Sequence, residues 1–386
     1  MIGQRISAWL FVAFLLTGCG SRASSGKWVP APTPPLVPGR VSLGLTTWNL
    51  ERFDGAGKGD ETFPTRTSEQ LSWMARILLD THPDIIALQE ISPRSPFSSR
   101  TPLEQLVAEM NAQASPGDEW KGWGSADPGA ERLGGTVCLL WNSRTVERVA
   151  FAELTGLRVG YREGVRVPLE DLRFPRIPPA ARFRSRRARD FDLTVIGVHL
   201  KASGGGFEDS LDANDIRRRG ELEDLLGEWV LRPDRQGKLG DKDVVILGDF
   251  NERAVYLVRL LDQFGTRDDT RERLVRYPDA LDPDRQSFLF AGDLTRSRKD
   301  YTWRGNAEAG QEKGWKGKEG IFEEDVTWAR YTNVIDHVLI SGSLVPLWDG
   351  EAPITYFEES FPLSEHVHFS DHRPVSVRFL LEAAAD

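Results

Sequence analysis

The sequence predicts a single globular domain of the α/β class. Short apolar runs, too short for helices, alternate with segments in which apolar residues recur at helical spacing. Several of these runs are apolar on both faces, as in residues 85–88 and 244–247, which is typical of central strands covered on two sides. From residue 41 onward no Pro-rich linker and no internal repeat interrupts the pattern, so we expect residues 41–386 to form one domain.

The expected strands are spread over the whole of this domain. They are residues 43–50, 84–90, 136–142, 191–200, 243–251, 333–341 and 374–380. Helices are expected between them. One is capped by Ser68 and stops at Pro83, and others cover residues 103–113 and 214–230.

Two stretches look inserted between these elements. Residues 154–190 contain several Pro and many Arg, and residues 265–330 are rich in charge, Gly and Trp. We expect both to be long loops near one rim of the fold, where function is often located.

Composition excludes several classes of protein. The 386 residues include 49 Lys and Arg against 58 Asp and Glu, a net charge of −9, and 40% are apolar. This balance is ordinary for a globular protein and excludes both a disordered chain and a protein with many membrane spans. With only two Cys, neither a disulfide-dense scaffold nor a Cys-rich zinc fold is available. The negative charge argues against general coating of nucleic acid, although it permits a local basic groove.

The N-terminal residues look like a targeting segment rather than part of the fold. An apolar run over residues 6–16 is shorter than the about 20 residues that span a bilayer, and it suits the core of a signal peptide. Small residues precede Cys19, as in a bacterial lipobox, so we expect a signal peptide over residues 1–18 and a lipidated Cys19. Residues 19–40, rich in Pro and Ser, are the expected tether. The prediction is a lipid anchor in the cell envelope, at the outer membrane and facing the periplasm or the exterior. An ordinary signal peptide with a chance Cys is the alternative.

Polar side chains stand at the ends of the apolar runs, where a plain core strand would not need them. They are Asn49, Glu90, His199, Asp249, Asn251, Asp336, Asp371 and His372. Each one alone could be a cap, a turn residue or a surface group. Their joint occurrence favours one shared rim. Carboxylate oxygens without a Cys cluster suit a hard cation such as Mg²⁺, Mn²⁺ or Ca²⁺. Asp–His combinations beside such a metal supply what phosphoester hydrolysis requires: an activated water, neutralised charge at phosphorus and a proton for the leaving oxygen.

This ordered set resembles the endonuclease/exonuclease/phosphatase family, which includes pancreatic-type deoxyribonuclease, abasic-site endonucleases, inositol polyphosphate phosphatases and neutral sphingomyelinases. The resemblance is carried by Gly-Asp-Phe-Asn at residues 248–251 and Ser-Asp-His at 370–372, with support from Leu-Gln-Glu at 88–90. It spans nearly the whole domain. It implies an α/β fold that is a four-layer sandwich of two mixed β-sheets flanked by helices, with strand ends forming one active-site rim.

The resemblance also implies a metal site for Mg²⁺, with Mn²⁺ or Ca²⁺ as alternatives. Glu90 looks like the principal metal ligand, helped by Asn49. Asp249 would polarise the attacking water or hold a metal, and Asp371 would supply a further carboxylate close to the metal. Deoxyribonuclease-like members place a Glu before the third strand to orient the first His. Glu131 is displaced from that position, so the acidic partner of His199 stays open.

Catalytic and phosphate-binding roles follow from the same resemblance. His372 is the candidate base or transition-state stabiliser, with Asp336 orienting its imidazole. His199 resembles a phosphate-contacting imidazole, and Asn251 would hydrogen-bond the phosphate. Arg176, in an Arg-x-Pro element, would reach the phosphate with its paired donors, although an exposed loop Arg is an equal alternative.

Three interpretations of the substrate compete. A nuclease acting on DNA, or on RNA, is favoured by His199 and by a run of arginines that would track a phosphate backbone: 173, 176, 182, 184, 186, 187 and 189. These arginines are otherwise explained by pairing with the surplus acid. A sphingomyelinase-like or inositol-phosphate hydrolase is the second interpretation, and a non-catalytic envelope binding protein is the third. We expect a divalent-metal-dependent phosphodiesterase, with a nuclease leading, a nucleic-acid substrate and no obligate protein partner.

Overall fold

The computed structural model describes most of the domain but not the whole chain. The described residues are 38–54, 66–93, 99–125, 135–155, 159–162, 165–168, 174–202, 213–226, 233–251, 289–290, 301–302, 321–322, 336–349, 370 and 372–384. The expected signal peptide, Cys19, Glu131, Asp371 and most of residues 265–330 lie outside them. Within the described residues, no helix has the length and apolar character needed to cross a membrane.

Two mixed β-sheets form the centre of the fold. The first sheet has five strands in the order β15-β1-β2-β4-β3, and the second has six in the order β11-β14-β10-β9-β8-β5. The first sheet comprises β1 (Arg40–Phe53), β2 (Ile85–Ile91), β3 (Trp120–Gly124), β4 (Thr136–Asn142) and β15 (Val375–Glu382). The second comprises β5 (Val146–Glu153), β8 (Pro179–Ser185), β9 (Asp192–His199), β10 (Val244–Asp249), β11 (Leu289–Phe290) and β14 (Asp336–Ile340). Two small ribbons pair β6 (Val159–Arg162) with β7 (Val165–Pro168), and β12 (Tyr301–Thr302) with β13 (Ile321–Phe322).

Three α-helices of the described chain flank the sheets: α1 (Ser68–Asp80), α2 (Pro102–Gln113) and α3 (Ala213–Leu225). The sequence placed the first cap at Ser68, but the cap is Thr67, whose hydroxyl accepts from the Gln70 amide while the Gln70 side chain returns to Thr67. α2 begins with the same arrangement. Short 3₁₀ helices lie at Pro233–Leu239, before β10, and at Gly342–Leu347, after β14.

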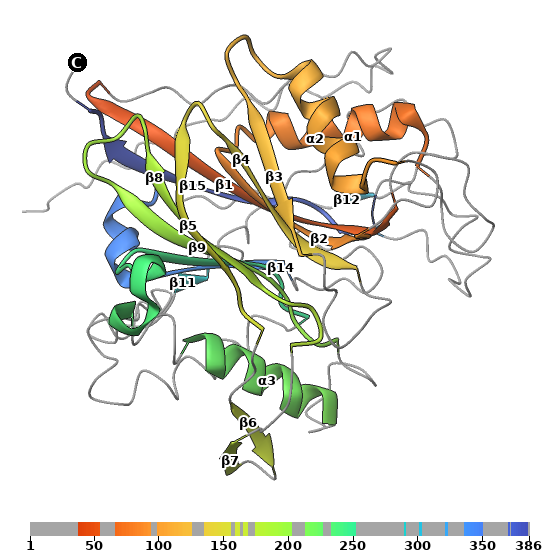
Figure 1. Ribbon diagram of the computed structural model, residues 1–386, viewed down its shortest axis with the longest axis vertical. Coiled ribbons are helices and arrows are strands. Elements are labelled where there is room, and N and C mark those ends of the chain that lie inside the picture. The colour runs from red at the N-terminus through yellow and green to blue at the C-terminus, as the bar shows by residue number, and fades with distance from the viewer. Residues whose placement is uncertain are drawn as a thin grey trace, which may run out of the picture.

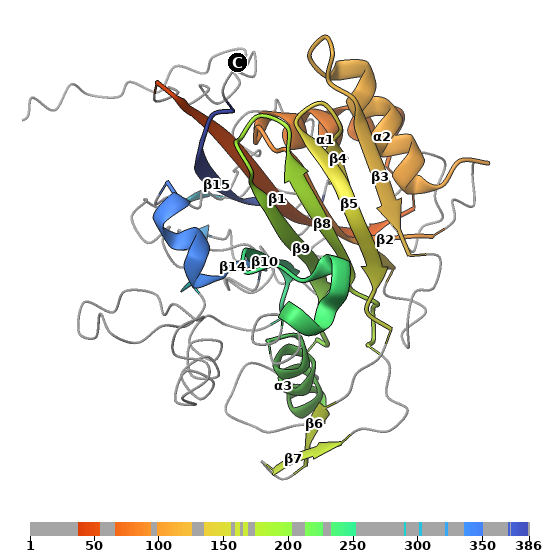
Figure 2. The same cartoon turned by 60° about the vertical axis from the view of Figure 1, so that its left-hand side comes forward.

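In the part of the chain that the structure describes, three separate apolar cores lie between four layers. The middle core lies between the sheets and includes Leu45, Ile85, Ala87, Val195 and Val245. A second core joins the first sheet to α1 and α2 through Ile86, Leu88, Met74, Ile77 and Leu106. A third joins the second sheet to α3 through Ile196, Val198, Leu222, Leu225 and Leu226. Adjacent residues of β2 alternate between two cores, as the pleat requires. The helices therefore cover opposite outer faces (Figure 1; Figure 2), and the expected four-layer sandwich is confirmed.

The expected long loop over residues 154–190 is wrong in part, because β8 is an inner strand of the second sheet, between β5 and β9. Its Arg182 and Arg184 point away from the core, while Ala181 and Phe183 are buried in it. Pro179 occupies the first position of the strand, where a proline is tolerated. The alternation of buried and exposed residues along β8 was not recognised in the sequence, because prolines flank it and its exposed residues are arginines. The edge strands β3 and β5 were not predicted either.

Strand direction brings the functional strand ends to one rim. β1 and β2 run parallel and pair Asn49 with Gln89, and β9 and β10 run parallel and pair His199 with Asp249. β14 is antiparallel to β10 and starts at Asp336, directly opposite Asp249. β15 is antiparallel to β1. In Figure 1, β1 is red and β15, beside it, is dark blue. Residues just before β15 therefore reach the same rim.

Candidate active site

The first sheet contributes an amide and a carboxylate. The Asn49 side chain donates from Nδ2 to Glu90 Oε1 at 3.3 Å and to Asp249 Oδ2 at 3.0 Å, while its Oδ1 accepts from the Glu51 amide at 3.0 Å. In this arrangement Asn49 bridges the two carboxylates. The Arg52 amide donates to Glu90 Oε2 at 2.9 Å. Together these contacts fix both oxygens of Glu90.

A backbone irregularity aims Glu90 at the rim. Its φ is +61°, and the β2–β4 register shifts between Leu88 and Ile91, so the strand carries a bulge at this point. Gly135 lies against it, and a Cβ there would stand 2.8 Å from the Glu90 Cα. A side chain at residue 135 would therefore displace the proposed metal ligand.

The second sheet contributes His199, Asp249 and Asn251. Gly248 precedes Asp249 with φ +149°, and a Cβ there would stand 2.0 Å from the Val198 carbonyl oxygen, so only glycine allows β10 to lie this close to β9. Asn251 has φ +51°, a conformation in which Asn is enriched. Its amide donates to Asp249 Oδ1 at 2.8 Å, and its Nδ2 donates to the Leu200 carbonyl at 2.9 Å.

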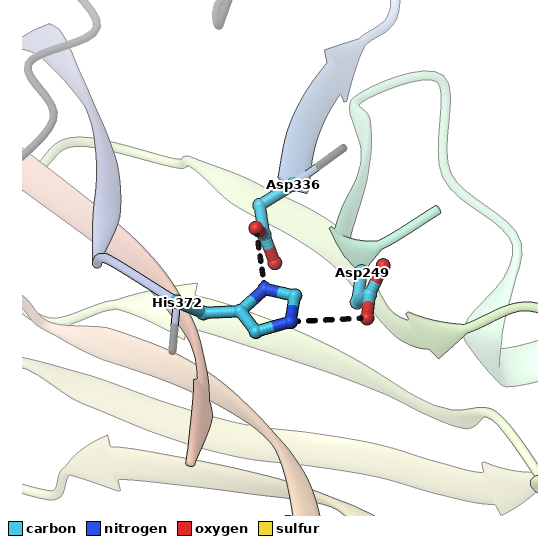
Figure 3. Close-up of side chains that lie close together, drawn as sticks. All are labelled: Asp249, Asp336 and His372. Carbon is cyan, nitrogen blue, oxygen red and sulfur yellow. Dashed lines mark hydrogen bonds and ion pairs between the residues drawn. The ribbon is translucent and has the colours of Figure 1, made fainter. Parts of the chain in front are cut away.

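Asp336 and His372 form a buried pair beside Asp249 (Figure 3). The distance from His372 Nδ1 to Asp336 Oδ2 is 2.8 Å, and His372 Nε2 faces Asp249 Oδ2 at 3.9 Å. A carboxylate only accepts, so Nδ1 carries a hydrogen and the ring turns its Nε2 edge toward Asp249. Ser370 links this pair to the first sheet, because its hydroxyl donates to the Asn49 carbonyl at 2.5 Å and accepts from the His372 amide at 3.0 Å.

The two sheets meet at Asp249 and Glu90. His199 Nε2 lies 3.5 Å from Asp249 Oδ2 and 3.9 Å from Glu90 Oε1. Six side chains that are scattered over more than three hundred positions of the sequence thus gather around one point: Asn49, Glu90, His199, Asp249, Asp336 and His372.

Burial dominates the electrostatics of this point. It raises the pKa of Asp249 to about 7, an effect that His372 opposes and Asp336 reinforces. Burial also lowers the pKa of His199 well below its usual value, and the charges of Arg176, His372 and Lys201 act in the same direction. His199 is therefore neutral at pH 7.

These groups fit a hard divalent cation. Glu90 and Asp249 present carboxylate oxygens on either side of the Asn49 amide, and the raised pKa of Asp249 marks a buried negative charge without full compensation. A second set of donor atoms, from Asp249, Asp336 and His372, lies within 4.8 Å of one another. Asp249 belongs to both sets. Asp371, the other ligand expected from the sequence, lies outside the described residues.

Arg176 is at the rim but largely buried, and it donates from a terminal nitrogen to the Leu200 carbonyl at 3.2 Å. The other described arginines of its segment lie toward the opposite end of β8, where each pairs with an acid. Arg182 lies 3.0 Å from both Asp192 and Asp241. The remaining pairs are Arg184 with Asp192, Arg186 with Glu147, Arg187 with Asp84 and Arg189 with Asp190. These five arginines therefore fit the alternative interpretation, in which they pair with the surplus acidic residues.

Two residues that support the rim were not predicted. Arg66 is 1% exposed and donates to the carbonyls of Leu50 and Glu51, both at 2.8 Å, so it holds the turn that follows Asn49. Glu221 on α3 is fully buried and accepts from the Lys201 amide at 2.9 Å. A single charged residue in a polar stretch normally faces solvent, and the sequence contains no signal that separates these two from their neighbours.

Comparisons with known proteins found similarity to solved structures, but not to a protein family or a curated protein. No protein-family model matches the sequence, and no curated protein matches it significantly. Similar solved structures include an endonuclease/exonuclease/phosphatase from Bacteroides vulgatus, 16% identical, with 89% of this chain and 100% of that chain covered and a TM-score of 0.48. The human Nocturnin catalytic domain with bound sulfate is 14% identical, with 88% and 97% covered and a TM-score of 0.48. TDP2 from D. rerio, complexed with a single-strand DNA product, is 12% identical, with 88% and 98% covered and a TM-score of 0.48. At this level the likeness carries no argument, and the proposed chemistry rests on the geometry of the rim.

Proposed function

We propose that the protein is a divalent-metal-dependent phosphodiesterase, and that it is a nuclease acting on DNA or, alternatively, on RNA. One observation carries the proposal. The buried Asp336–His372 pair faces Asp249, and Glu90 and His199 complete the same cluster from two different sheets. Burying ionisable carboxylates and imidazoles this close together adds little to the stability of the fold. Such clusters are typical of catalytic sites, and this one suits phosphoryl transfer.

The residues of the chain have separable roles in this proposal. Glu90 and Asp249, with Asn49 between them, would hold the cation, which when bound supplies charge neutralisation at the phosphoryl oxygens and a more acidic water. His372 Nε2 takes or returns a proton at the rim, and Asp336 stabilises the imidazolium that results. His199, neutral at pH 7, donates from its ring to a phosphoryl oxygen.

An anionic substrate is supported by the charges next to the rim. Arg176 and Lys201 lie at the end of β9, close enough that their charges lower the pKa of His199. The paired arginines farther along β8 give no support, because their charge is already matched by carboxylates. The proposal of a nucleic-acid substrate therefore rests on the residues at the rim and not on the arginines of β8.

A substrate panel tests the proposal. Purified protein is incubated with duplex DNA, RNA, sphingomyelin, inositol phosphates and a chromogenic phosphodiester, each with Mg²⁺ or Mn²⁺ and with EDTA. We expect metal-dependent cleavage of DNA that EDTA abolishes, and a loss of about 10³-fold or more in Asp249→Ala or His372→Ala. Turnover of sphingomyelin or inositol phosphates without DNA cleavage would replace the nuclease by a lipid or inositol-phosphate hydrolase. No turnover of any ester would leave a binding protein.

We also propose that Cys19 carries a lipid anchor that holds the enzyme at the outer membrane. The proposal is supported by the lipobox-like residues before Cys19 and by the Pro-rich tether after it. Metabolic labelling with a fatty acid should mark the wild-type protein and leave Cys19→Ala unlabelled. Labelling of both would contradict it.

A further inference from the structure

The chain segment that follows His199 is held by α3. Leu200 and Lys201 leave the second sheet directly after β9. Glu221 Oε2 accepts from the Lys201 amide at 2.9 Å, and Arg218 donates to the Lys201 carbonyl at 3.3 Å. Residues three apart lie on one face of a helix, so a single face of α3 holds both backbone polar groups of Lys201.

The same segment is fastened from the other side at Leu200. Its carbonyl accepts from Arg176 at 3.2 Å and from Asn251 Nδ2 at 2.9 Å, and its amide donates to the Asp249 carbonyl at 2.9 Å. The end of β9 is therefore bound to β10, to Arg176 and to α3 within two residues of His199.

Glu221 is the acidic centre of this arrangement. It is 0% exposed, and its Oε1 lies 3.2 Å from Arg217 Nε. It is also next to Leu222 and Leu225, which belong to the core between α3 and the second sheet. A buried carboxylate in such surroundings stabilises less than an apolar side chain would, so its contacts point to orientation rather than to stability. Burial also raises the pKa of Glu221 to about 7.

His199 needs support of this kind. Its Nε2 lies between Asp249 and Glu90, and within the described chain no group accepts a hydrogen bond from its buried Nδ1. Among the described residues, the ring is therefore oriented by its backbone and by the packing around it, not by an acidic partner at Nδ1 of the kind that Asp336 gives His372.

We propose that Glu221 is a positioning residue, which fixes the His199 imidazole between Glu90 and Asp249 by holding the backbone of Lys201. The proposal rests on the proposed function, in which His199 contacts the phosphoryl group. Loss of the Lys201 hydrogen bond lets the end of β9 move, and a displacement of about 1 Å at a reacting group costs on the order of 100-fold in rate.

Two variants and a matched control test this role. Glu221→Gln keeps an oxygen that accepts from Lys201, and Glu221→Ala removes it. Asp84→Ala is the control, because Asp84 is a buried carboxylate with the same kinds of contact, to the Gly44 amide at 2.8 Å and to Arg187 at 2.7 Å, at the opposite end of β2 from Glu90. On the chromogenic diester we expect Glu221→Ala to lower kcat about 10- to 100-fold with KM changed less than about threefold. Glu221→Gln should keep at least about a third of kcat, and Asp84→Ala should lower the melting temperature without lowering kcat.

Coupling to His199 separates positioning from plain stability. If Glu221 acts through His199, adding Glu221→Ala to His199→Ala should lower kcat by less than about twofold further. Amide hydrogen exchange gives a second readout, in which Glu221→Ala should speed exchange at Leu200 and Lys201 while the centre of β10 stays protected. Independent, multiplicative losses of kcat would overturn the proposal, as would exchange at Lys201 that matches the Asp84→Ala control. If the wild-type protein turns over no ester, the proposed function fails, and the exchange measurement still decides whether Glu221 holds this segment.

Discussion

Replacing Asp336 by Asn should remove most of the activity while leaving the fold in place. Asp336 is fully buried, and its Oδ2 lies 2.8 Å from His372 Nδ1. A carboxylate fixes the hydrogen on Nδ1 and stabilises the imidazolium. An amide of the same size is neutral, and when it donates to Nδ1 it forces the hydrogen onto Nε2, the atom that must accept a proton at the rim.

The size of the effect follows from these two losses. A hydrogen bond to a charged group contributes about 1.5–3 kcal/mol, which corresponds to roughly 10- to 150-fold in rate if it is felt only in the transition state. Loss of a correctly protonated base contributes about 10²–10⁴-fold. Because the two overlap in one imidazole, we expect kcat/KM on a chromogenic diester to fall by at least about 100-fold, with KM nearly unchanged.

The control is Asp243→Asn, at the far end of β10, where the carboxyl is also buried but distant from the rim. It should leave kcat/KM within about threefold of wild type. Both variants should unfold cooperatively in urea. If Asp336→Asn retains a third or more of the activity, His372 does not depend on Asp336 for its tautomer, and the role given to this pair is wrong.

Other perturbations have equally definite outcomes. Mg²⁺ or Mn²⁺ at about 100 times its Kd should add about 2.7 kcal/mol to the free energy of unfolding, and Glu90→Gln or Asp249→Asn should abolish this gain. Differential scanning fluorimetry with and without EDTA measures the effect. A wild-type melting temperature that does not shift would contradict the metal site. Gly248→Ala should cost more than about 4 kcal/mol in urea unfolding, because its Cβ would overlap the Val198 carbonyl; a loss below about 1 kcal/mol would refute the close approach of β10 to β9. The Glu221 carboxyl has its pKa raised from 4.5 to about 7, so the folded state binds more protons than the unfolded state in that window and stability falls as pH rises through it, by up to about 3 kcal/mol. Glu221→Gln should flatten this slope between pH 4.5 and 7.5, and parallel slopes would count against the shift.

Much of the site was predictable because its residues terminate recognisable strands. The runs before Asn49, Glu90, His199 and Asp249 are long and apolar enough to be identified alone, and parallel pairing then brings their ends together. The family resemblance supplied the roles of these residues and the four layers of the fold. The roles themselves stay predictions.

Other parts of the fold could not be predicted, for physical reasons. β8 carries arginines on its outer face, where they pair with acids that are distant in sequence, so its composition is that of a loop. The bulge at Glu90 depends on its register with β4. Arg66 and Glu221 act on backbone groups of distant segments, and only the assembled structure identifies those partners. Most of residues 265–330 lie outside the described residues, and a single domain over residues 41–386 stays a prediction.

The division of the proposed cation-binding groups between two sheets has a mechanical consequence. Glu90 belongs to one sheet and Asp249 to the other. The Asn49 side chain bridges them at the rim, and away from the rim the sheets pack through the apolar side chains of the middle core. Any slippage of one sheet across the other changes the gap between the two carboxylates. Affinity for the ion should therefore depend on how tightly the middle core is packed. Shortening a buried side chain of that core should weaken ion binding, although the change is distant from the rim.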